Sequence, residues 1–246
     1  MDLKNQLKIV GMRGTIFVPQ IQFSWELVKR LQPIFEVEFI PSVNMSPAPM
    51  FIEGKLMNTV MSPGEWSLIS QDKKQRIMFK SQNIDVIEEL NADYSVETIS
   101  RFGERCKLLF SSMIPDSIKC SRIAIAPTFE YTGEKDSIIK FANTCFHLNE
   151  FKGVKMDNCD FSQVFRVQER ISDSMDVYFN YLSKFYTINK VVPIEGVNQL
   201  VEVSMIDFDI NSKIDPDVVF DNGAINDFFS KVDRFCADFI SFYFHE

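Results

Sequence analysis

Two aspartates in the last quarter of the sequence have the spacing of a metal site. Asp207 and Asp209 alternate with apolar residues in a segment typical of a β-strand. Residues two apart on a strand share a face, so both carboxylates would point the same way. Such a pair suits Mg²⁺, and Glu130 on another expected strand could be a third ligand. The pattern indicates a metal-dependent phosphoryl-transfer or nuclease-like site, although a solvated strand end would give the same pattern.

A second group of polar residues could bind an anion. Arg166 and Arg170 fall on one face of an expected strand, about 13 Å apart along it. Two arginines at this spacing could bind a phosphorylated ligand or an acidic partner. The alternative is a solvated outer sheet face that carries ordinary cross-strand charge pairs.

The common catalytic signatures are absent from the sequence. It has no phosphate-binding G-x-x-x-x-G-K-[ST] loop, no G-x-G-x-x-G after a strand and no G-x-S-x-G elbow. The only histidines are His147 and His245, which excludes an H-E-x-x-H metal site. We therefore expect no cofactor, apart from Mg²⁺ if the carboxylate site is real.

Charge and cysteine content narrow the class of protein. The formal net charge of −8 disfavours nucleic acid and anionic membranes as partners. The five cysteines form no C-x-x-C pair and are odd in number, so neither a disulfide framework nor a zinc site is expected. With no apolar run near the ~20 residues of a membrane span, the sequence predicts a cytoplasmic protein.

The apolar periodicities define the elements that would carry these residues. Two long amphipathic helices are expected, one over Ser95–Ile114 and one over Ala224–Phe244, with shorter helices after Ser24 and at Lys135–Phe146. Pro41–Pro49 contains three prolines and is expected to be a loop. Strands are expected at Leu7–Val18, Met50–Val60, Glu65–Ser70, Gln75–Lys80, Asn83–Ile87, Lys119–Tyr131, Phe161–Ile171, Asp176–Ile188 and Gln199–Ile210.

This order of elements predicts an α+β fold. Mainly antiparallel sheets would carry helices on one face, in two similar halves that each read strand, helix, several strands and helix. The halves would span residues 1–115 and 116–246 and would form one compact domain. The 24 phenylalanines indicate a thick aromatic core, although a subunit interface that forms a homo-oligomer would also account for some of them.

The layout and a few short motifs resemble a sporadically distributed family of uncharacterised bacterial proteins of similar length. The matching pieces are Ser121–Ile125 after the first long helix, Ile206–Asp209, and the terminal Phe242–Phe244. The apolar pattern Arg76–Phe79 also fits, whereas the proline-rich N-terminal entry of the family is missing. The resemblance implies a mobile gene tied to phage defence or phage–host conflict, and it transfers no catalytic residue.

From these observations we expect a non-enzymatic binding or interaction protein, such as a scaffold, a sensor or an inhibitor subunit. Its partner would be another protein or a second copy of the chain. One alternative is the metal-dependent enzyme that uses Asp207 and Asp209. The other is a sensor of an anionic small ligand, bound by Arg166 and Arg170 at a pocket between the halves.

Overall fold

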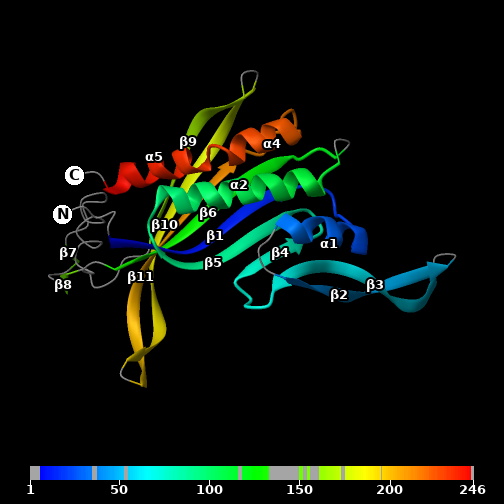
Figure 1. The fold of residues 1–246 in the computed structure, drawn as a ribbon, viewed down its shortest axis with the longest axis horizontal. Helices are drawn as coiled ribbons and strands as arrows, with labels where there is room; N and C mark the ends of the chain where they lie inside the picture. The colour runs from blue at the N-terminus through cyan, green and yellow to red at the C-terminus, as the bar shows by residue number, and fades with distance from the viewer. Residues whose placement is uncertain are drawn as a thin grey trace.

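One nine-stranded antiparallel sheet runs through the centre of the protein, in the order β2-β3-β4-β5-β1-β6-β11-β10-β9 (Figure 1). The computed structural model describes residues 6–34, 38–52, 55–115, 118–132, 150–151, 154–155, 161–172, 175–194 and 196–244. The strands are β1 (Leu7–Phe17), β2 (Phe39–Ile52), β3 (Lys55–Ser70), β4 (Gln75–Phe79), β5 (Ile84–Asp93), β6 (Arg122–Tyr131), β9 (Phe161–Ser172), β10 (Met175–Ile194) and β11 (Val197–Ser212). A separate two-stranded sheet joins β7 (Glu150–Phe151) and β8 (Val154–Lys155). The predicted α+β class with a mainly antiparallel sheet is thus confirmed. The helix expected at Lys135–Phe146 and both histidines lie outside the described residues.

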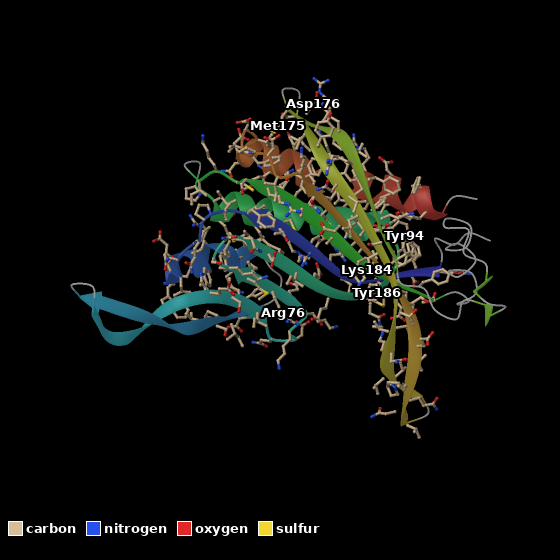
Figure 2. The ribbon with its side chains drawn as sticks, turned by 180° about the vertical axis from the view of Figure 1, so that it is seen from behind. Arg76, Tyr94, Met175, Asp176, Lys184 and Tyr186 are labelled. Carbon is tan, nitrogen blue, oxygen red and sulfur yellow. The ribbon has the colours of Figure 1, made fainter. Side chains whose placement is uncertain are left out.

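The helices lie on one face of this sheet. They are α1 (Trp25–Leu31), which runs into the 3-10 turn η2 (Gln32–Ile34), α2 (Val96–Met113), α4 (Asn222–Phe229) and α5 (Val232–Phe244). Figure 1 looks onto this helical layer, and Figure 2 views the sheet from behind, where no helix of the described residues covers it. The sheet therefore has a helix-covered face and an open face.

The hydrophobic core fills the space between the helices and the covered face. Eleven phenylalanines are among its largest fully buried side chains, so a large share of the aromatic excess is core: Phe79, Phe102, Phe110, Phe129, Phe179, Phe185, Phe208, Phe220, Phe228, Phe229 and Phe235.

Two glycines let the layers approach closely. A β-carbon at Gly14 of β1 would lie 2.6 Å from the Cys106 sulfur of α2, and one at Gly103 of α2 would lie 2.5 Å from the Phe229 carbonyl oxygen of α4. Side chains larger than hydrogen at these two positions would push the helices away.

Two predictions for the N-terminal half are wrong. The segment Pro41–Pro49 is part of strand β2, and the single strand expected at Met50–Val60 is divided between the end of β2 and the start of β3. A proline lacks the N–H that a central strand must donate, but β2 is an outer strand that pairs with β3 on one side only. Prolines are therefore tolerated there, and their number does not distinguish an edge strand from a loop.

The expected terminal helix is two helices. α4 ends at Phe229, and the chain turns through Ser230 and Lys231 before α5 begins at Val232. The turn closes with a hydrogen bond from the Lys231 N–H to the Phe228 carbonyl. The predicted apolar face is nevertheless buried at every position on both sides of the break: Ile225, Phe228, Phe229, Val232, Phe235, Cys236, Phe239, Ile240 and Tyr243.

Two hairpins extend beyond the sheet as two-stranded ribbons (Figure 1). β3 pairs with β4 only over Trp66–Ile69, so the rest of the β2–β3 hairpin projects. The β10–β11 hairpin continues past the last β10–β9 pair, at Phe185, and the last β11–β6 pair, at Ser204. These two ribbons give the molecule an extended outline.

The two predicted halves contribute separate blocks of strands to the sheet. The first supplies β1 to β5 and the second supplies β6 and β9 to β11, and the two blocks meet where β1 pairs with β6. That the halves resemble each other in structure stays a prediction.

Candidate functional site

Asp207 and Asp209 lie on the open face of the sheet, on strand β11. Their apolar neighbours Ile206, Phe208 and Ile210 are buried on the helix-covered face. Asp209 accepts a 2.9 Å hydrogen bond from the Asn211 side chain. Asp207 and Asp209 therefore share a face, as their spacing predicts.

Glu130 lies on the neighbouring strand β6, but its carboxylate is engaged elsewhere. Lys190 of β10 donates to it over 2.8 Å, and its register partner on β11 is Met205 rather than an aspartate. Among the described residues, no group of three or more His, Cys, Asp or Glu side chains is placed to hold a metal ion. The structure thus brings Asp207 and Asp209 together without gathering the three-carboxylate set.

The two arginines of β9 lie at the margin of the open face. Arg166 donates from Nε to the Asn180 side chain over 3.3 Å, and Arg170 donates to the Ser172 carbonyl over 3.4 Å. β9 is the outermost strand on this side, and both side chains are exposed. They do not line the hollows at the centre of the face, which other residues form.

The centre of the open face is hollowed because its floor is built of small residues. Gly11 on β1 and Ala124, Ala126 and Thr128 on β6 lie along the junction of these two strands. Longer side chains rise on both sides of this floor, from β5 and β1 on one side and from β11 and β10 on the other. The hollows of the open face therefore lie over this part of the sheet.

Two hollows lie at the centre of the open face, and Arg13 of β1 borders both of them. The "small hollow" has a volume of about 170 Å³ and is lined by Arg13, Thr15, Phe17, Lys80, Asn83, Asp85, Arg122, Ala124 and Asp209. The "large hollow" has a volume of about 420 Å³ and is lined by Gly11, Met12, Arg13, Ile87, Ala126, Thr128, Leu182, Lys184, Asp207, Phe208 and Asp209. Arg13 and Asp209 border both hollows.

A buried carboxylate forms one wall of the small hollow. The Asp85 side chain is 4% exposed and accepts hydrogen bonds from Thr15 (2.7 Å), Asn83 (2.9 Å) and the Lys80 ammonium (2.6 Å). A buried carboxylate needs such partners, because losing its hydration is costly. With these three donors the charge of Asp85 is locally compensated.

Arg122 closes the end of the small hollow. Its guanidinium donates to the Ser212 carbonyl over 3.2 Å and to the Asn211 side-chain oxygen over 2.6 Å, and it lies 5.1 Å from the centre of the Phe17 ring. All of these partners are neutral, so the contacts fix the guanidinium in place and leave its charge uncompensated by any carboxylate of its own.

Arg13 is held differently. It lies between Ile87 of β5 and Ala126 of β6 in the sheet register, and its side chain is exposed. Within the described part of the chain it makes no hydrogen bond or ion pair. A guanidinium that borders two hollows and has no acceptor among the described residues is available to a ligand.

Lys184 of β10 lines the large hollow, and the phenol of Tyr186 lies beside it. The Lys184 ammonium lies 4.7 Å from the centre of the Tyr186 ring, and both side chains stand on the open face (Figure 2). Partial burial, the charge of Asp207 and a hydrogen bond to Asp207 raise the pKa of Tyr186 to about 12. Tyr186 is therefore a neutral phenol beside the Asp207 carboxylate at physiological pH.

Sequence reasoning missed the residues that shape the hollows. Alternation along β1 would have placed Arg13, Thr15 and Phe17 on one face, but a strand with an outward arginine is common and does not indicate a site. The partners of Asp85 come from β1 and from the turn before β5, so only the folded sheet assembles them. The Asp207–Asp209 spacing was the one signal that pointed to this region.

Comparison with known proteins adds no relative. No protein-family model matches the sequence, and no curated protein matches it. None of the helices in the described ranges combines the length and apolar character needed to cross a lipid bilayer. The geometry of the open face is therefore the basis for inferring function.

Proposed function

We propose that this protein is a non-enzymatic binding protein and that the open face of its sheet is the binding surface. One observation carries the proposal. In the part of the chain that the structure describes, the helices cover one face only, and the other face is hollowed at its centre, where charged side chains line the walls. Ligand sites are typically concave, with a few polar groups that fix the orientation of what they bind.

The charges around the hollows favour a ligand that carries an anionic group. Four cations, Arg13, Lys80, Arg122 and Lys184, line them together with three carboxylates. This local excess of cations stands out in a chain with a net charge of −8. The chemistry on offer is charge pairing and hydrogen bonding, which suits recognition.

Mapping of small organic probes tests the proposal. Fragments of mixed polarity, added to isotope-labelled protein, should shift the backbone NMR signals of Arg13, Ala126, Thr128 and Lys184. Replacing Ala126 with Trp should remove these shifts, because the indole would fill the floor of the large hollow without entering the core. Shifts that gather over the helices instead, or that survive in the Ala126→Trp variant, would contradict a binding surface on the open face.

Several finer expectations remain proposals. We propose that the protein acts in the cytoplasm, that it self-associates or binds a partner protein, that its two halves are structurally similar, and that it takes part in conflict with phage. Light scattering at micromolar concentration tests self-association, and a monomer mass would remove that proposal. For the alternative function, a metal-dependent enzyme, the only remaining candidate ligands are Asp207 and Asp209.

A further inference from the structure

We propose that the small hollow binds the phosphate group of a small phosphorylated molecule and that the large hollow holds the rest of that molecule. Arg13 and Arg122 would bind the phosphate. This inference rests on the proposed function, because it assigns a ligand class to the same open face. The proposed anion-binding residues are thus Arg13 and Arg122 rather than Arg166 and Arg170 of β9, which the sequence had indicated.

The two arginines are placed at opposite ends of the small hollow. Arg13 is the register partner of Ala126, and Arg122 is the register partner of Phe17, four residues further along β1. The two positions are about 13 Å apart along the strands. The pair Thr15 and Ala124 lies between them and forms a low floor. Two long side chains that enter one hollow from its two ends can both reach an anion held above that floor.

The charge balance of the small hollow favours an anion. The carboxylate of Asp85 already has Lys80 and two neutral donors. The contacts of Arg122 are to neutral groups, and Arg13 has no partner among the described residues. Two guanidiniums therefore line this hollow together with Asp209 as the remaining carboxylate. Arginine is suited to phosphate because its planar head can donate two parallel hydrogen bonds.

The large hollow has the chemistry of the organic part of such a ligand. Its 420 Å³ is within the range of small-molecule sites. Asp207 and Asp209 offer acceptors for hydroxyl or amino groups, and Ile87 and Leu182 offer apolar contact. Asp207, which lines the large hollow but not the small one, would repel additional phosphates, so a monophosphate should bind more tightly than the triphosphate of the same compound.

Calorimetry and thermal shift on the whole chain test this assignment. The probes are inorganic phosphate, ribose 5-phosphate, the four 5′-nucleoside monophosphates, one matching triphosphate and the unphosphorylated nucleosides. We expect at least one monophosphate ester to raise the Tm and to bind at least tenfold more tightly than its nucleoside, inorganic phosphate or its triphosphate. A ligand bound only by the folded state must raise the Tm.

Variants locate the site. Arg13→Ala should weaken binding at least tenfold, Arg13→Lys should recover only part of it, and Arg166→Ala should leave it unchanged. Arg101→Ala is the matched control, because Arg101 is an exposed arginine of α2 on the helical layer. Equal losses in Arg13→Ala and Arg101→Ala would overturn the assignment by showing a nonspecific charge effect.

Three other outcomes would also overturn it. The first is that no phosphorylated probe binds below millimolar concentration. The second is that a short single-stranded oligonucleotide binds more tightly than any monophosphate, which would point to a nucleic-acid surface. The third is that Arg166→Ala abolishes binding while Arg13→Ala does not. If fragment mapping finds the hollows while every phosphate probe fails, the phosphate assignment is lost and the binding surface stands.

Discussion

Thr15 of β1 donates a 2.7 Å hydrogen bond to Asp85, the residue directly opposite it on β5, and both side chains are buried. This contact ties the floor of the small hollow to its wall. Because Asp85 also accepts from Lys80 and Asn83, the carboxylate holds β1, β5 and the turn before β5 in one arrangement. The shape of the candidate site therefore depends on a single buried charge.

Replacing Asp85 with Ala should lower the free energy of unfolding by about 2–3 kcal/mol, because the buried Thr15 hydroxyl loses its acceptor and Lys80 loses its counter-charge. Urea unfolding measures the loss. Glu89→Ala is the matched control on the same strand and face, since Glu89 is half exposed and pairs with the exposed Arg76. The control should cost less than about 1 kcal/mol. Equal effects for the two variants would mean that the Asp85 network is not structurally important.

The glycines of β1 and α2 give a graded prediction about packing. Gly103→Ala should be the most destabilising, by about 3 kcal/mol, because the new β-carbon meets the Phe229 carbonyl, which cannot move without moving α4. Gly14→Ala should cost about 2 kcal/mol, since it meets the more adaptable Cys106 side chain. Gly11→Ala has only an ordinary 3.7 Å contact and should be neutral. Thermal unfolding of the three variants in another order would contradict this packing.

The buried thiols predict a loss of stability at alkaline pH. Burial raises the pKa of Cys120 from 9.0 to about 11, and it raises the pKa of Cys106 and Cys236 as well. Between pH 9 and 11 the unfolded chain releases these protons while the folded chain keeps them. The contribution of Cys120 is therefore complete below pH 9 and is lost progressively up to about pH 11.

Cys120→Ser isolates this effect, because a hydroxyl can still donate to the Arg122 carbonyl as the thiol does but does not ionise in this range. Near pH 10, the fall in unfolding free energy per pH unit should be smaller in the variant by about 1 kcal/mol. Urea titrations at pH 8, 9 and 10 measure the slope. The same slope in both proteins would show that Cys120 keeps an ordinary pKa in the folded state.

The sequence predicts local elements well where one periodicity and one cap agree. The α2 helix is an example: Ser95 accepts a hydrogen bond from the Thr98 N–H, and Ile99, Cys106, Phe110 and Met113 are buried. Val96, the first residue of the helix, has the same apolar character but is 45% exposed. Capping and periodicity are properties of neighbouring residues, so they can be read locally.

The candidate site was harder to predict because it depends on strand order. Asp209, Ala126 and Arg13 lie on three successive strands, β11, β6 and β1, whose sequence order gives no hint of this arrangement. Alternation tells which residues share a face of one strand, but not which strands are neighbours. The spacing of Asp207 and Asp209 therefore predicts a polar face on β11. It does not predict that arginines of neighbouring strands line the same hollows.

Titration with Mg²⁺ or Mn²⁺ separates a metal site from the binding surface proposed for the same hollow. We expect no heat of binding at millimolar metal, because Asp209 already accepts from Asn211, Glu130 already accepts from Lys190, and Asp207 lies beside the Tyr186 phenol. Two carboxylates beside the cations Arg13 and Lys184 form a poor site for a divalent ion. Calorimetry on the purified chain measures this, with Asp207→Asn as the comparison. Tight binding in the natural protein that disappears in Asp207→Asn would instead support the metal-dependent enzyme, and the open face would then have to be treated as a catalytic surface.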